Sequence, residues 1–113
     1  MGGNGYLEIP YQDVNRGRLT AYVRWGFSQN PYASFSNDVS VVVNWPVPFP
    51  NGCLFALATI VRSATEASSN DEVTIQVASL GAASGTFEYN DINGLYTIKN
   101  SVIPGFYWLA IGF

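Results

Sequence analysis

The sequence contains no histidine and a single cysteine, Cys53. Without histidine the chain lacks the commonest general base and the commonest transition-metal ligand, so we expect neither a metal site nor a cofactor. One cysteine cannot form an internal disulfide bond or a thiolate metal site. Cys53 also lies in an apolar run without a histidine partner, which favours a position in the core over a role as a nucleophile.

Charge is scarce as well, because charged residues make up 12% of the 113 residues and the net charge is −3. The five cations are scattered along the chain: Arg16, Arg18, Arg24, Arg62 and Lys99. Nucleic-acid binding requires a clustered basic face, so we do not expect it. No apolar run approaches the roughly 18 residues of a membrane span, and the N-terminus lacks the features of a secretion signal. We therefore expect no membrane insertion.

Apolar residues are plentiful, at 48% of the chain, with 15% aromatic, which excludes intrinsic disorder. Their spacing is period-2 rather than helical in the segments 18–26, 39–45 and 73–80. Residues 86–99 are typical of a hairpin that turns at Asn93-Gly94. The pattern predicts an all-β domain, an antiparallel β-sandwich over residues 6–113, preceded by a linker or a remnant of a longer chain at residues 1–5.

Two segments, 53–61 and 106–113, are apolar on both faces. A two-layer sandwich covers only one face of each strand, so the second face must meet a loop, solvent or another subunit. We expect a subunit contact, because two such strands occur in so short a chain. The candidates for this interface or for the core are Phe55, Leu57, Ile60, Trp108, Leu109, Ile111 and Phe113. The three tryptophans, Trp25, Trp45 and Trp108, are expected to anchor buried faces.

The segment 45–52 contains Pro46, Pro48 and Pro50, which occupy every second position. Their missing amide donors all point to the same side, so that side cannot form an ordinary ladder of hydrogen bonds. The spacing predicts an edge strand or an extended crossing between two sheets.

The chain resembles the C-terminal domain of bacteriophage tail fibres. The matching features are Asn4-Gly5-Tyr6 with Pro10, YVRWG (22–26), VPFPNGCLFALAT (47–59), QVASL (76–80) and the closing FYWLAIGF (106–113). The stretch 11–21 departs from the family, because it is longer than the compact turn expected there, and loops 27–38 and 62–72 are this chain's own.

This resemblance implies a homotrimeric knob at the distal end of a fibre, attached to an upstream fibre shaft. It implies a place at the tail fibre tip of a virion, made in the host bacterial cytoplasm. It also implies recognition of a bacterial surface receptor, which we expect to be a lipopolysaccharide or another glycan. A trimerisation and folding domain without a ligand of its own is the alternative.

Glycan recognition combines aromatic faces with short polar side chains, and loops 27–38 and 88–96 contain both. The receptor-binding candidates are Tyr32, Phe35, Asn37, Asp38, Tyr89, Asn90, Asp91, Asn93 and Tyr96. For Tyr89 and Tyr96, packing across a strand pair is the competing interpretation.

We do not expect an enzyme. A small glycan hydrolase would need paired carboxylates, and the closest pairs are Asp71 with Glu72 and Glu88 with Asp91. These pairs lie in polar stretches, where solvated surface charge is the ordinary interpretation, so the hydrolase stays a second alternative.

Overall fold

The computed structural model describes residues 4–63, 73–91 and 98–113. In this part of the chain the ordered elements are strands: β1 (Gly5–Asp13), β2 (Gly17–Gln29), β3 (Ser34–Phe35), β4 (Val39–Asn44), β5 (Cys53–Val61), β6 (Val73–Leu80), β7 (Ser84–Asp91), β8 (Ile98–Lys99) and β9 (Gly105–Gly112). The described residues contain no helix long and apolar enough to span a membrane. The all-β prediction is confirmed.

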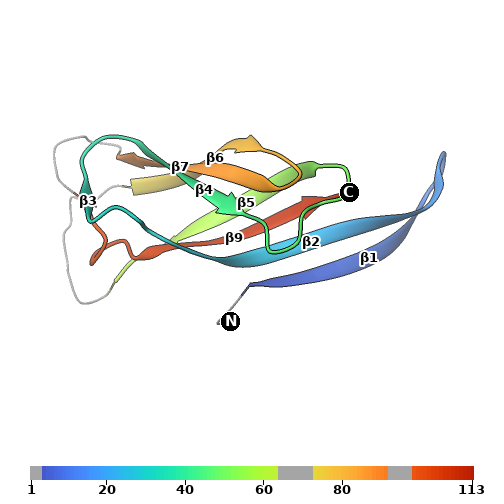
Figure 1. Cartoon of the computed structure of the whole chain (residues 1–113), viewed down its shortest axis with the longest axis horizontal. Coiled ribbons are helices and arrows are strands. Elements are labelled where there is room, and N and C mark those ends of the chain that lie inside the picture. Colours follow the sequence, from blue (N-terminus) through green and yellow to red (C-terminus); the bar gives the residue numbers. More distant parts are fainter. Residues whose placement is uncertain (1–3, 64–72, 92–97) are drawn as a thin grey trace.

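Two antiparallel sheets face each other, one with the order β1-β2-β9-β5 and the other with the order β4-β7-β6. A short pair of β3 and β8 lies at one end (Figure 1). The hairpin of β1 and β2 runs along the side of the sandwich and projects past the C-terminus (Figure 1). The predicted antiparallel sandwich is therefore confirmed, and it carries an arm that the smaller sheet does not cover.

Aromatic side chains fill the space between the two sheets. The rings of Phe87 on β7 and Phe106 on β9 have centroids 5.1 Å apart, and those of Trp45 and Trp108 are also 5.1 Å apart. The indole nitrogen of Trp45 donates a hydrogen bond of 2.9 Å to the carbonyl of Gly81. The predicted burial of Trp45 and Trp108 is confirmed.

The two strands that are apolar on both faces are neighbours, because β5 pairs with β9. Phe106, Trp108 and Ala110 enter the core, and Ile60 of β5 packs against it. The opposite face of these strands carries Phe55, Leu57, Leu109, Ile111 and Phe113, which are exposed or half-buried. A bulge between Cys53 and Phe55 interrupts the alternation and leaves Leu54 exposed.

Residues 45–52 connect β4 of the smaller sheet to β5 of the larger one. The interpretation of this proline-rich segment as a crossing between sheets is confirmed. Phe49 points into the core and is 2% exposed, so the segment also closes the sandwich.

The expected burial of Trp25 is wrong for the single chain. Arg24, on the more polar set of alternate residues, is buried, whereas Trp25 on the apolar set is only half-buried. In the inward position the charged side chain of Arg24 is stabilised by a hydrogen bond to the carbonyl of Val47 and by contacts with aromatic rings. The apolar set is left on the outside.

The predicted hairpin over residues 86–99 is not supported by the strand pairing. The turn at Asn93-Gly94 lies outside the described residues. Over its described length β7 pairs with β4 on one side and β6 on the other, and β8 pairs with β3. Both edges of β7 are already occupied, so β8 has no place beside it.

Candidate functional site

The outer side of the four-stranded sheet is an apolar face. Strand pairing brings Trp25, Leu109 and Leu57 into one row across β2, β9 and β5. Directly paired residues share a face of a sheet and side chains alternate along each strand, so the rows two residues away also point outward. We define the apolar face by these residues: Trp25, Phe27, Phe55, Leu57, Tyr107, Leu109 and Ile111.

The apolar face lacks any cover within the described chain. Leu57 is 62% exposed and Phe55 is 47% exposed. A hollow of about 640 Å³ lies on this face between Trp25, Leu57, Tyr107 and Leu109. The face continues onto β1 through Leu7 and Ile9, which pair with β2 residues of the same side. Contiguous exposed apolar surface of this kind marks an interaction site for another macromolecule.

The arm formed by β1 and the start of β2 is a second distinctive surface. β2 pairs with β9 only from Tyr22 onward, so residues 17–21 extend past the end of β9 with β1 as their described strand neighbour. Residues 6–12 of β1 are exposed on both faces of the hairpin. Apart from Tyr6, whose ring lies 5.4 Å from the guanidinium of Arg24, the arm therefore presents side chains that do not enter the core.

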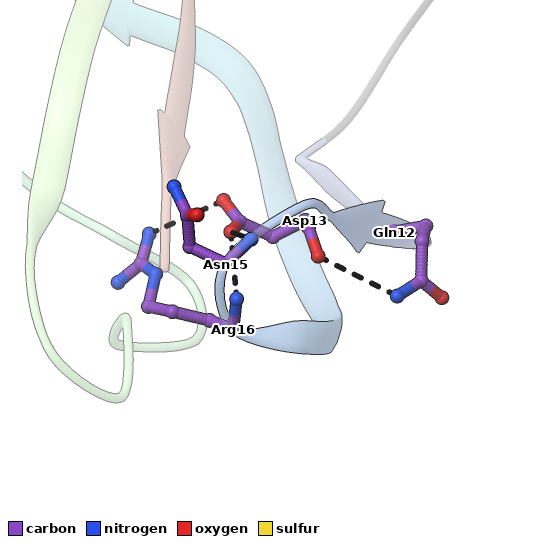
Figure 2. A network of polar contacts seen from close by, with 4 residues as sticks. All are labelled: Gln12, Asp13, Asn15 and Arg16. Carbon is purple, nitrogen blue, oxygen red and sulfur yellow. Dashed lines mark hydrogen bonds and ion pairs between the residues drawn. The ribbon is translucent and has the colours of Figure 1, made fainter.

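The tip of the arm is ordered by Asp13. Its carboxylate accepts hydrogen bonds of 2.8 and 2.9 Å from the backbone amides of Asn15 and Arg16 (Figure 2). These amide donors hold the pKa of Asp13 below its usual value. Gly17 then closes the turn with a φ of +79°, a left-handed conformation that favours glycine. The turn fixes the backbone from which Arg16 projects, with its guanidinium 3.8 Å from the Asp13 carboxylate.

The family described as "Putative tail fiber protein gp53-like, C-terminal" matches residues 23–113. The chain belongs to this tail fibre family. The match confirms the resemblance drawn from the sequence. It begins inside β2, so most of the arm lies outside it.

Solved structures of pyocin fibres share the fold of this tail fibre domain. An R1 pyocin fibre of P. aeruginosa, covering its C-terminal residues 323–701, is 18% identical, with a TM-score of 0.63 over 97% of this chain and 28% of that one. An N-truncated R1-type pyocin tail fibre is 18% identical, with a TM-score of 0.64 over 98% of this chain and 88% of that one. An R2 pyocin fibre of P. aeruginosa is 16% identical, with a TM-score of 0.58 over 98% of this chain and 26% of that one. The tail fibre domain thus spans about a quarter of the length of two of these structures. The search of curated proteins gave no match.

The structure separates the predicted loop candidates of the tail fibre domain into buried and exposed residues. Phe35 and Tyr89 are buried in the core, with ring centroids 5.5 Å apart, so neither presents a ring face to a receptor. Tyr32 is half-buried and its hydroxyl donates a hydrogen bond of 2.6 Å to the carbonyl of Ser40. These aromatic residues hold the end of the sandwich together, and the packing interpretation of Tyr89 agrees with its position.

The polar candidates lie close to the same end. Asn37 and Asp38 are exposed, and the Asp38 carboxylate accepts a hydrogen bond of 3.1 Å from the backbone amide of Asp91. Asn90 and Asp91 are half-buried at the end of β7. Asn93 and Tyr96 lie outside the described residues. Among the predicted loop residues that the structure describes, Asn37 and Asp38 are the exposed ones.

Among the described residues, the features considered for catalysis lie apart from one another. Glu88 and Asp91 differ in parity along β7, so their side chains point to opposite faces of that strand. The other pair, Asp71 with Glu72, lies outside the described residues. Burial raises the pKa of the Cys53 thiol, and its sulfur lies 3.6 Å from the carbonyl oxygen of Ile111. A raised thiol pKa is the reverse of what activates a nucleophilic cysteine.

Arg24 is the residue of the tail fibre domain that sequence reasoning missed. Its side chain is 1% exposed and its Nε donates a hydrogen bond of 2.8 Å to the carbonyl of Val47. The guanidinium lies 5.4 Å from the ring centroids of Tyr6 and Tyr22 and 5.2 Å from that of Phe49. The shared parity of Tyr22 and Arg24 was a signal in the sequence, but the contacts with Tyr6 and Phe49 depend on the fold.

Tyr89 provides a test of the core that does not disturb its packing. Its buried hydroxyl has no hydrogen-bond partner among the described residues, and burial raises the pKa of Tyr89 to about 12. We expect Tyr89→Phe to increase the free energy of unfolding by about 1 kcal/mol at neutral pH, because an unsatisfied buried hydroxyl is removed. Urea unfolding at equal protein concentration measures this change.

The same variant has an expected pH dependence. The unfolded phenol ionises near its usual pKa of 10.0, below the folded value of about 12. The wild-type protein therefore loses stability as the pH rises between these two values, because the unfolded state releases its proton first. Tyr89→Phe should lack this part of the loss. A stability difference between the two proteins that is the same at neutral and alkaline pH would contradict the assignment.

Proposed function

We propose that this tail fibre domain assembles into a homotrimer through the apolar face and attaches the fibre to a receptor on the bacterial surface. The receptor is a lipopolysaccharide or another surface glycan, and the other partner is the upstream fibre shaft. The domain stands at the tip of a virion's tail fibre and is made in the cytoplasm of the host bacterium.

The apolar face supports this proposal. It carries seven apolar side chains and no charged one at its described positions. Leaving such surface in water costs about 25 cal/mol for each Å² of apolar area. Further copies of the same chain can cover the apolar face. When the same contact is repeated around a threefold axis, the result is a closed trimer. The strands run along the long axis of the molecule, which suits a bundle of three copies within a fibre (Figure 1).

Light scattering coupled to gel filtration tests the assembly. The expected mass is about 37 kDa, three times the 12.3 kDa of the chain. A monomer that persists at micromolar concentration would contradict the proposed use of the apolar face.

Receptor attachment is tested with a fluorescently labelled trimer and cells of a strain that is sensitive to the particle carrying the fibre. We expect saturable binding to the cells and competition with adsorption of the particle. Heat-denatured domain serves as the control. A trimer that neither binds these cells nor blocks adsorption would contradict the receptor role and favour the trimerisation and folding domain, which the apolar face supports equally.

A further inference from the structure

A second hollow, of about 360 Å³, lies between the arm and the C-terminal end of the sandwich. It occupies the space beside β2 that β9 leaves open, because the pairing of these strands stops at Tyr22 and Gly112. The residues that line it include Tyr11, Arg16, Thr20, Tyr22, Asn51 and Phe113. The volume falls in the range of small-ligand pockets, about 300–1,000 Å³.

The wall opposite the arm is fixed by the backbone. The amides of Asn51 and Gly52 donate hydrogen bonds of 2.7 and 3.2 Å to the carbonyl of Phe113. The amide of Phe113 donates in return to the carbonyl of Gly52, at 3.0 Å. On the other side, the Asp13 turn fixes the backbone that carries Arg16 (Figure 2). The hollow is therefore formed before any ligand arrives.

The lining combines rings with hydrogen-bonding groups that the protein does not use. The hydroxyls of Tyr11, Thr20 and Tyr22 and the side-chain amide of Asn51 make no hydrogen bond to the described part of the chain. Proteins bind a saccharide through aromatic rings that pack against its C–H faces. Hydroxyl and amide side chains form hydrogen bonds with its hydroxyl groups. The hollow on the apolar face differs, because its lining is almost entirely hydrocarbon.

Arg16 gives the lining its charge. It is the charged residue among those that line this hollow, and its side chain is 67% exposed. The nearby side-chain carboxylates are outside the lining. Asp13 accepts from the turn amides and also forms an ion pair of 3.8 Å with one guanidinium nitrogen of Arg16, and Glu8 lies on β1 opposite Tyr22. A guanidinium matches the geometry of a carboxylate or a phosphate with two parallel hydrogen bonds.

We propose that this hollow binds an anionic saccharide, with Arg16 paired to its carboxylate or phosphate group and Tyr11 and Tyr22 packed against its ring. The inference rests on the proposed receptor role and places the receptor site on the arm, at the opposite end of the sandwich from Asn37 and Asp38. Tyr11, Arg16, Thr20 and Tyr22 all precede residue 23, where the family match begins.

The test measures binding of the full chain to purified lipopolysaccharide from a sensitive strain. The lipopolysaccharide is used intact and after its phosphates are removed and its carboxylates reduced. We expect the stripped form to bind at least tenfold more weakly. We also expect Arg16→Gln to weaken binding to the intact form about tenfold and Tyr11→Leu to weaken it by a similar factor, with the mass of the assembly unchanged.

Arg18→Gln is the matched control, because Arg18 is an exposed arginine on the same arm that does not line the hollow. Its binding should stay within about twofold of wild type. Equal losses for Arg16→Gln and Arg18→Gln would indicate nonspecific attraction to the arm and overturn the site. Wild-type affinity in both Arg16→Gln and Tyr11→Leu would also overturn it, and a loss in Asp38→Ala would then place the receptor at the other end. No binding of the wild-type protein to any lipopolysaccharide would instead contradict lipopolysaccharide as the proposed receptor.

Discussion

Replacement of Leu57 by glutamate is expected to convert the proposed trimer into folded monomers. Leu57 lies in the central row of the apolar face and is 62% exposed in the single chain. A glutamate at this position is solvated in the monomer, so the fold loses little. In the trimer each copy would bury a carboxylate without a partner, at a cost of several kcal/mol per copy. Light scattering should report about 12.3 kDa instead of three times that mass.

Val42→Glu is the control for this result. Val42 is 60% exposed, nearly the same as Leu57, but it lies on β4 of the smaller sheet. The expected mass of Val42→Glu is that of the wild-type trimer. Circular dichroism establishes that both variants retain their strands. If Leu57→Glu remains a trimer, or if Val42→Glu also dissociates, the apolar face is not the assembly surface.

The sequence predicted the strands because alternation is a local property, but it did not predict which face of a strand is inside. In residues 18–26 the apolar set containing Trp25 was the natural choice for the core. The fold reverses this choice, because the inner position opposite Val47 suits the guanidinium of Arg24 and the outer face carries the row of Trp25, Leu109 and Leu57. An alternating pattern does not distinguish a core from an interface, since both exclude water.

Two of the loop candidates, Tyr89 and Phe35, lie in the core for a related reason. Tyr89 was grouped with polar neighbours, although it shares its parity with Phe87 and lies on the same buried face of β7. Phe35 belongs to a two-residue strand whose partner, Ile98, is far away in the sequence. Strand pairings between distant segments, and the bulge beside Cys53, are determined by tertiary contacts. The local sequence therefore does not predict them. The hollow of the arm was missed because its walls come from three separate segments.

Replacement of Arg24 by alanine is expected to lower the free energy of unfolding by about 3 kcal/mol. The carbonyl of Val47 would lose its hydrogen bond from Nε, and a partly buried acceptor without a donor costs about 1–3 kcal/mol. The contacts of the guanidinium with the three rings of Tyr6, Tyr22 and Phe49 contribute about 2 kcal/mol when desolvated. Urea unfolding at fixed protein concentration measures the change, because the stability of an assembly depends on concentration.

Two further variants separate the causes. Arg24→Lys retains the charge but loses the planar group that lies over the rings, so its stability should fall between those of wild type and Arg24→Ala. Arg18→Ala removes an exposed arginine of the same parity on β2 and should change stability by less than about 0.5 kcal/mol. If Arg24→Ala is as stable as Arg18→Ala, the buried guanidinium does not hold the crossing segment.

If Arg24→Ala is destabilised as expected, one side chain of β2 fixes Val47 and Phe49. The same segment then carries Asn51 to the hollow, so loosening it should also weaken lipopolysaccharide binding in Arg24→Lys under conditions where that variant is folded.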